Sequence, residues 1–261
     1  MFFVAAFALG AVVGSFLNVC IIRVPKEESV IFPASHCVDC RAPIAWHDNI
    51  PIASYFWLRG RCRSCGAKIS KQYVVVEFLT ACLFVLFYNY FGISVAGAVW
   101  LLFSLALLVQ SAIDFRHQII PDGITLPGIL LGTFLSVLIP GLHGQTSWLI
   151  GLREAAIGVL LGGGFLYAAG TIAEWILKKE AMGGGDVKLL AMIGAFVGWQ
   201  GVLWTVLVSS VLGSIVGVYL RFKKGEQMIP FGPYLGLAAF LYIFFGEKTI
   251  RAYLNFIGWG I

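Results

Sequence analysis

Apolar stretches about as long as a bilayer is thick recur along this chain of 261 residues, and they limit the folds that it can adopt. A helix needs about 20 apolar residues to cross the hydrocarbon core, whereas an open strand cannot cross it because its backbone groups would stay unpaired. Such stretches occur near residues 2–22, 74–91, 95–113, 123–140, 153–176, 187–199, 201–220 and 230–246. Charged residues form only 12% of the chain, against about 25% in soluble domains. The sequence therefore predicts an all-α polytopic membrane protein with about eight transmembrane helices, and it argues against a soluble enzyme, a secreted disulfide scaffold or a disordered tail.

The basic residues fall mainly on one side of these predicted spans. Of the 18 lysine and arginine residues, 15 lie in four connecting segments, near residues 23–72, 114–122, 177–188 and 221–229. Because cytoplasmic loops of membrane proteins are enriched in basic residues, we expect these segments in the cytoplasm and a multi-pass protein of the bacterial inner membrane. The net charge of +5 follows from this asymmetry, so membrane lipid is the expected surrounding and no nucleic-acid partner is implied. The first stretch lacks a basic n-region and a small-x-small cleavage site, so it is predicted to be an uncleaved helix.

The segment 23–72 differs in composition from the rest and is predicted to be a small cytoplasmic domain. It contains two cysteine knuckles, Cys37-Val38-Asp39-Cys40 and Cys62-Arg63-Ser64-Cys65. Two knuckles at this separation are typical of a four-cysteine zinc ribbon, with iron as a second possible occupant. Two disulfides or four free thiols are the alternative, and a reducing cytoplasm argues against disulfides. The predicted organisation is a first helix at 1–22, the metal-binding insert at 23–72 and a transmembrane bundle at 73–261.

Carboxylates lie at the predicted membrane edge. Asp114 ends the third span, Asp122 follows Pro121 at the start of the fourth, and Asp186 follows Gly183-Gly184-Gly185 at the start of the sixth. Helix capping is the simpler interpretation of each of these residues alone, and it is favoured for Asp122. Asp114 and Asp186, however, are both predicted at the cytoplasmic ends of their helices, where bundling can bring them together.

Two adjacent carboxylates share one proton, so one can act as a general base on water while the other polarises a peptide carbonyl. That is the chemistry of an aspartic protease, and the chain has no zinc-protease, serine-hydrolase or P-loop motif that would compete with it. His117 lies three residues after Asp114 and could bind a metal together with it, but a solvated histidine at the membrane interface is the favoured interpretation.

These residues together resemble the type IV prepilin peptidases, bifunctional enzymes of the G-x-G-D membrane aspartic protease family. The resemblance rests on motifs that occur in order along nearly the whole chain: Gly14-Ser15-Phe16-Leu17-Asn18-Val19, both cysteine knuckles, Ile113-Asp114 to Pro121-Asp122, Gly183 to Asp186, and Ile229-Pro230-Phe231-Gly232-Pro233-Tyr234. It implies that Asp114 and Asp186 form the catalytic dyad of a hydrolase. It also implies that prepilin or pseudopilin leaders, of type IV pili or type II secretion, are cleaved after a glycine on the cytoplasmic side.

The same resemblance implies N-methylation of the new N-terminal residue, commonly Phe, with S-adenosylmethionine as methyl donor. Gly60 and Glu77 match family positions and are weak candidates for this second site, while Glu77 could equally be an interfacial acid paired with Lys71 or Arg23. Two alternatives stay open: a peptidase without methylation, and a transporter or assembly scaffold with a zinc-ribbon docking domain. The small-residue pairs Gly10/Gly14, Gly158/Gly162 and Gly213/Gly217 are interpreted as close helix packing.

Overall fold

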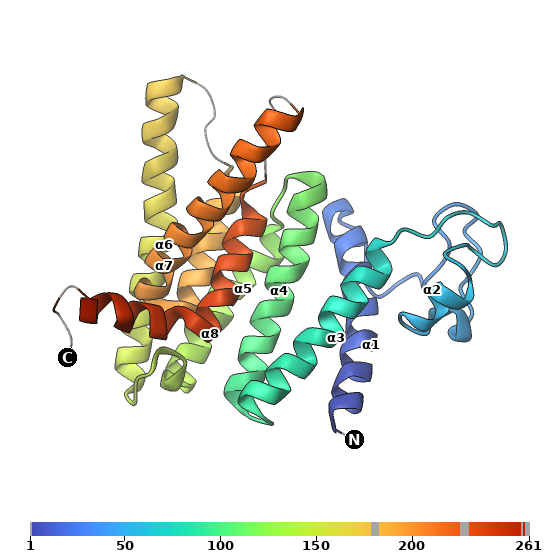
Figure 1. Cartoon of the computed structure of the whole chain (residues 1–261), viewed down its shortest axis with the longest axis horizontal. Coiled ribbons are helices and arrows are strands. Elements are labelled where there is room, and N and C mark those ends of the chain that lie inside the picture. The colour runs from blue at the N-terminus through green and yellow to red at the C-terminus, as the bar shows by residue number, and fades with distance from the viewer. Residues whose placement is uncertain (1, 179–182, 225–229, 257, 259–261) are drawn as a thin grey trace. The chain divides into compact units, whose positions relative to one another are not determined.

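The computed structural model of the chain describes residues 2–178, 183–224, 230–256 and 258. Over these residues the fold is helical, with no strand, and it forms two compact units, Met1–Leu105 and Ala106–Ile261 (Figure 1). Five helices in the described part are long and apolar enough to span a membrane. The predicted all-α polytopic membrane fold is therefore confirmed, while eight spans is an approximate number.

The first unit is built on two long helices that pack against each other, α1 (Phe2–Arg23) and α3 (Gln72–Phe91), and it includes the start of α4 (Val95–His117). Glycines allow the close approach of α1 and α3. A Cβ atom at Gly10 would lie 2.7 Å from the Cα of Ala81, and one at Gly14 would lie 2.7 Å from the Cα of Glu77. The predicted packing role of the Gly10/Gly14 pair is confirmed.

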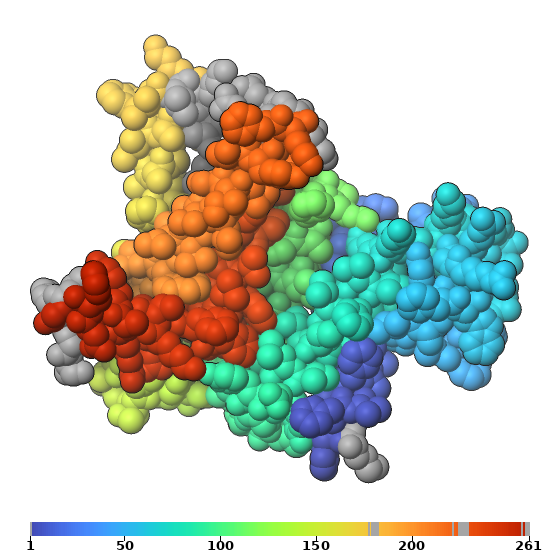
Figure 2. Space-filling view, viewed as in Figure 1, coloured from blue at the N-terminus to red at the C-terminus, as the bar shows by residue number. Residues whose placement is uncertain are grey.

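The cysteine-containing insert connects α1 to α3 and forms a separate lobe beside them (Figure 2). Its regular structure is limited to three short helices, η1 (Val24–Lys26), η2 (Trp46–Asn49) and α2 (Ala53–Trp57). None of these three helices has a buried residue. Since a domain without an apolar core needs another source of stability, the insert depends on local hydrogen bonds and on its cysteine cluster.

The second unit contains the rest of α4, then α5 (Asp122–Leu138), η3 (Pro140–His143), α6 (Trp148–Leu177), α7 (Gly184–Lys224) and α8 (Gly232–Phe256). Its centre is the pair α6 and α7, which packs backbone to backbone: Gly158 and Gly194 contact each other, and Gly162 contacts the carbonyl of Leu190. No side chain would fit at these crossings. The Gly158/Gly162 pair therefore has the predicted packing role.

A break at Gly198 divides α7 into two helical halves, 184–197 and 199–224. The backbone at Gly198 has φ 70° and ψ −178°, a conformation that residues with a side chain rarely adopt. The break coincides with the boundary between the predicted segments 187–199 and 201–220. Both segments are thus helical, as predicted, but they form the two halves of one interrupted helix.

A polar node joins three elements of the second unit close to this break. The hydroxyl of Ser136, near the end of α5, lies 3.0 Å from the carbonyl oxygen of Ala195 on α7 and 2.8 Å from Nε2 of His143 on η3. Ser136 is fully buried, and burial lowers the pKa of His143 to about 4. The imidazole is therefore neutral at physiological pH, and its Nε2 atom shares a hydrogen bond with the Ser136 hydroxyl.

Candidate active site and candidate metal centre

Asp114 lies at the end of α4 and is almost completely buried. Its Oδ2 atom accepts a hydrogen bond of 3.0 Å from the backbone N–H of Gly232, the first residue of α8. The first N–H groups of a helix have no partner within that helix, so they are suited to bind a carboxylate. A Cβ atom at position 232 would lie 2.6 Å from Oδ2, and only glycine permits this hydrogen bond.

Asp186 lies in the first turn of α7, where its backbone N–H bonds to the carbonyl oxygen of Gly183 at 3.1 Å. Ile120 connects the two acids. Its side chain is 3.0 Å from a Cβ built at Gly185, next to Asp186, and 3.1 Å from one built at Gly232, next to Asp114. The two carboxyl groups are near enough for the charge of Asp114 to act on Asp186. The structure thus brings the two predicted site residues into one neighbourhood.

The three glycines before Asp186 are not equivalent. A side chain at Gly185 would press on Ile120, whereas a Cβ atom at Gly184 would meet nothing within 4 Å. This difference gives a physical reason for the form G-x-G-D, in which the middle position is free. Met182 of the motif and Ile229 of the Ile-Pro-Phe-Gly-Pro-Tyr segment lie outside the described residues.

Asp122 has a different environment from the other two acids. Its carboxylate forms an ion pair with Nζ of Lys188, at 2.7 and 2.8 Å, and both side chains are partly exposed. The expected N-capping role is wrong by one position: Pro121 is the N-cap residue of α5, and Asp122 lies in its first turn. His117 is exposed and, among the described residues, belongs to no cluster of metal-ligating side chains.

The four cysteines of the insert lie on two turns with the same backbone hydrogen bonds. In the first, Cys37 N–H bonds to Ala42 O and Arg41 N–H to Cys37 O, each at 2.9 Å. In the second, Cys62 N–H bonds to Ala67 O at 2.8 Å, and Gly66 N–H to Cys62 O at 2.9 Å. A residue with positive φ, Arg41 in one turn and Gly66 in the other, ends each loop. This repetition shows that each Cys-x-x-Cys sequence forms the same turn.

The two turns bring their thiols together. The sulfur atoms of Cys37, Cys40, Cys62 and Cys65 all lie within 4.8 Å of one another, and those of Cys37 and Cys65 are 3.9 Å apart. Four thiolates about 2.3 Å from a tetrahedral Zn²⁺ would be about 3.8 Å from one another, so the arrangement fits this ion. The backbone N–H groups of Cys65 and Ser64 lower the pKa of the Cys62 thiol to about 7, whereas the pKa of the Cys65 thiol is raised to about 12, so without a metal the negative charge resides on Cys62.

A charged pair holds the second knuckle against η2. The guanidinium of Arg63 donates two hydrogen bonds of 2.6 Å to the carboxylate of Asp48. This contact keeps the pKa of Asp48 below its usual value. Arg63 is one of the two residues between Cys62 and Cys65, so the ion pair fixes the knuckle's orientation relative to the rest of the insert.

The two weak candidates for a methylation site both have partners within the first unit. Gly60 has φ +64°, and a Cβ atom there would lie 3.0 Å from the ring of Tyr55. Glu77 is buried on α3 and accepts a hydrogen bond of 2.7 Å from the N–H of Ile52. The guanidinium of Arg23 instead donates to the carbonyl oxygens of Ser29 and Pro33, and among the described residues no ion pair joins Glu77 to Lys71, so the expected pairing is wrong. These contacts account for both residues without a methyl donor.

Ile52 itself has a strained backbone. Its φ of 63° and ψ of −55° are rare for a β-branched residue, and they allow the N–H of Ala53 to reach the carbonyl oxygen of Pro51 at 2.6 Å. Such strain persists only where neighbouring contacts impose it. The Glu77 carboxylate, held on a long helix, provides one of these contacts and ties the insert to α3.

Two buried polar side chains within the predicted spans, Asn18 and Gln110, contact neighbouring helices. Asn18 is fully buried and donates a hydrogen bond of 3.0 Å to the carbonyl oxygen of Tyr73. Gln110 is buried, with its Nε2 atom 3.6 Å from the sulfur of Met192. These contacts do not favour the transporter alternative.

Sequence reasoning singled out both acids but gave no role to Ile120 or to Gly232. A signal for Gly232 exists in the sequence, because a Gly-Pro pair at the start of an apolar stretch marks a helix beginning at which another group can approach closely. Ile120 carries no such signal, since nothing distinguishes it from the other apolar residues nearby.

Fold and site together define a polytopic α-helical membrane protein with paired carboxylates at helix ends and a four-cysteine insert. Two family models match the chain: the Bacterial Peptidase A24 N-terminal domain over residues 8–91, and the Type IV leader peptidase family over residues 100–218. Among its relatives are three proteins named prepilin leader peptidase/N-methyltransferase. That of Pseudomonas putida is 35% identical over 285 residues, covering 98% of this chain and 95% of the relative. Those of Pseudomonas aeruginosa and Aeromonas hydrophila are 36% and 35% identical, covering 98% of this chain and 95% and 96% of the relatives.

The chain belongs to the type IV leader peptidase family. The resemblance found in its motifs is therefore confirmed over nearly the full length. No solved structure matches the chain significantly.

Proposed function

We propose that this protein is a membrane aspartic endopeptidase that removes the leader peptides of prepilins or pseudopilins and then N-methylates the new N-terminus. The observation that carries the peptidase activity is the common neighbourhood of Asp114 and Asp186 around Ile120. The names of its relatives support both activities.

In the proposed reaction, the ionised member of the pair takes a proton from a water molecule, and the water oxygen attacks the carbonyl carbon of the scissile bond. The protonated member donates to the carbonyl oxygen as negative charge develops there. When the tetrahedral intermediate collapses, the C–N bond breaks and the leaving amine receives a proton from the pair. Gly232 acts as a positioning residue here, because its N–H fixes one carboxyl oxygen of Asp114.

The proposed site faces the cytoplasm of a bacterium from within the inner membrane. The distribution of lysine and arginine supports this orientation, since 15 of 18 lie in segments on the same side as the two acids. A prepilin has a basic leader followed by an apolar helix. Its leader would remain in the cytoplasm while the helix enters the bilayer, which leaves the scissile bond at the interface.

For the insert, at 23–72, we propose a structural zinc site made of Cys37, Cys40, Cys62 and Cys65. All four ligands are cysteines, so no coordination position remains open for catalysis. The first helix, at 1–22, and the bundle, at 73–261, would be the membrane-embedded parts. S-adenosylmethionine is the proposed methyl donor, and it would supply an electrophilic methyl group to the free amine. Gly60 and Glu77 stay weak candidates for its site, because their contacts in the structure are explained without it.

The decisive test replaces each acid by its amide. In purified, detergent-solubilised protein, Asp114→Asn and Asp186→Asn should each abolish cleavage of a synthetic prepilin, because neither variant can share a proton between two carboxyls. Asp122→Asn is the matched control, since Asp122 lies at the same membrane edge but pairs with Lys188. Full cleavage by either dyad variant would exclude this mechanism. Mass spectrometry of the processed N-terminus, with donor present, tests methylation separately.

A further inference from the structure

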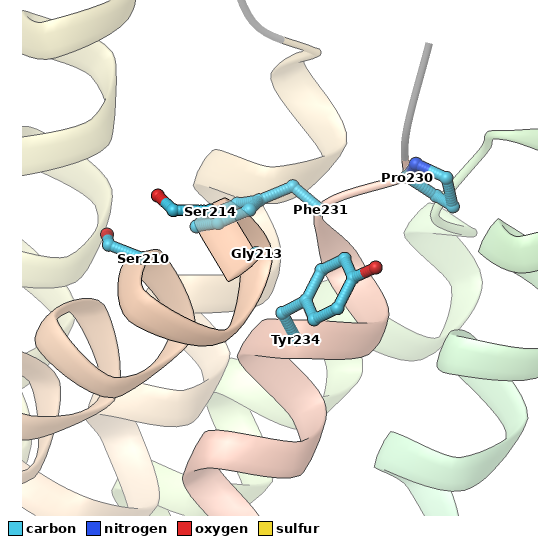
Figure 3. Close-up of a pocket in the computed structure, with 6 residues that line it drawn as sticks. All are labelled: Ser210, Gly213, Ser214, Pro230, Phe231 and Tyr234. Atoms are coloured by element: carbon cyan, nitrogen blue, oxygen red, sulfur yellow. The ribbon is translucent and has the colours of Figure 1, made fainter. Parts of the chain in front are cut away.

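A cavity of about 320 Å³ lies between the second half of α7 and the first turn of α8 (Figure 3). Its volume is in the range of small ligand-binding pockets. The lining is uncharged and combines small or hydroxyl-bearing positions with aromatic ones: Ser210, Gly213, Ser214, Pro230, Phe231 and Tyr234.

The cavity adjoins the candidate active site through the backbone. Phe231 lines it, and the next residue, Gly232, donates its N–H to Asp114. The lining residue Phe231 and the residue that binds Asp114 are thus consecutive in the chain, with Cα atoms about 3.8 Å apart. A peptide with its scissile bond at the two acids would therefore have a neighbouring residue at this opening.

Gly213 creates the space inside the cavity. A Cβ atom at this position would lie 3.7 Å from the Phe231 ring and 3.8 Å from the Tyr234 ring, so any larger side chain would occupy the volume beside them. Figure 3 shows both rings next to Gly213. Gly213 thus lies within ordinary contact distance of two residues at the start of α8, and its missing side chain leaves room for an apolar group beside them.

We propose that this cavity is a substrate subsite, which binds the first apolar side chain after the scissile bond of the pilin. This inference rests on the proposed function. The uncharged lining fits the apolar mature segment and not the basic leader, and aromatic rings provide large contact surfaces for an apolar side chain. Presenting a peptide bond to the acids also requires that the first turn of the pilin helix unwinds.

The two serines suit that unwound backbone. Backbone groups released at membrane depth need new hydrogen-bond partners, because an unpaired polar group there is costly. Ser210 and Ser214 are one helical turn apart on α7, and both are exposed. Their hydroxyls would bond to the freed peptide groups while the rings of Phe231 and Tyr234 hold the side chain.

The experiment uses two synthetic prepilins that differ only in having Phe or Ala directly after the scissile bond. Gly213→Leu fills the cavity and should lower kcat/KM for the Phe substrate by about tenfold or more, while the Ala substrate loses much less. Gly164→Leu is the matched control: Gly164 is a helical glycine with nothing within 4 Å of its Cβ position, and this variant should change neither value by more than about twofold.

Cleavage of the Ala substrate shows whether each variant is folded. If Gly213→Leu is inactive on both substrates, Ser210→Leu replaces it, because a leucine there fills the cavity from its exposed edge. The two substrates are then compared in the same way. The ratio of kcat/KM for the Phe substrate to that for the Ala substrate is compared between the unmodified protein and whichever of these two variants is active. An unchanged ratio overturns the subsite but leaves the proposed peptidase activity intact. If the unmodified protein cleaves neither substrate, the proposed function fails, and the subsite with it.

Discussion

The four-cysteine site and the paired-carboxylate site differ in how much of the chain is needed to build them. Each cysteine pair lies on one short turn, closed by its own backbone hydrogen bonds, and the two turns repeat the same geometry. The carboxylate site instead needs the end of α4, the start of α7, the start of α8 and Ile120 between them. The first site is a product of local sequence, and the second is a product of helix packing.

This difference predicts that the two sites fail separately. A change in a cysteine should remove the metal without moving the acids, and a change at a helix crossing should disturb the acids without releasing the metal. The following predictions test that separation in order of decreasing effect.

The largest effect is expected from the cysteine ligands. Cys37→Ser combined with Cys62→Ser removes one ligand from each knuckle and should release about one zinc equivalent per chain, because a structural site holds its metal only with the full ligand set. Metal analysis and limited proteolysis measure the loss and the loosening of the insert. Cys82→Ser on α3 is the control and should keep the metal. Absence of zinc and iron from the unmodified protein would exclude the ribbon.

Gly232→Ala should reduce prepilin cleavage by about a hundredfold, because a Cβ atom 2.6 Å from Asp114 Oδ2 displaces the carboxyl group and misplacement of about 1 Å costs that much. Its control is Gly184→Ala, which meets open space and should stay within about twofold of the unmodified rate. Both variants should retain their metal. Equal activity of the two variants would contradict the role of the Gly232 N–H.

The smallest effect concerns His143. Its pKa is about 4 in the folded protein and about 6.5 when unfolded, so below pH 6.5 the unfolded chain binds a proton that the native state does not. Stability should therefore fall as pH drops from about 6.5 toward 4, by about 1 kcal/mol at pH 5.5. Thermal unfolding in detergent at pH 7.5 and 5.5 measures this loss. The variant His143→Gln has no titrating group at this position and should lose less stability between these two pH values; an unchanged loss would contradict the assignment to His143.

The sequence predicted best what depends on short stretches of chain. Hydropathy located the helical segments, and the Cys-x-x-Cys spacing identified four residues whose sulfurs do gather within 4.8 Å. The Gly10/Gly14 and Gly158/Gly162 pairs were interpreted correctly, because a residue without a side chain at a helix crossing has few other uses.

What the sequence could not supply depends on three-dimensional neighbours. Gly213 has the same spacing signal as the packing glycines, yet it borders a cavity, since the identity of its neighbours is decided by how α8 begins. The ion pair of Asp122 with Lys188 and the hydrogen bond of Glu77 with Ile52 likewise join positions distant in sequence. Charge and spacing indicated that these acids need partners but not which partners they have.

The node at Ser136 has a mechanical consequence for the second unit. There, α5, η3 and α7 are joined through one buried hydroxyl, whereas α5 and α7 are joined near the acids by the exposed pair Asp122–Lys188, a type of contact that contributes little. The contact between α5 and α7 is therefore stronger at the Ser136 end, where it is buried, than at the end near the acids, where it is exposed to solvent.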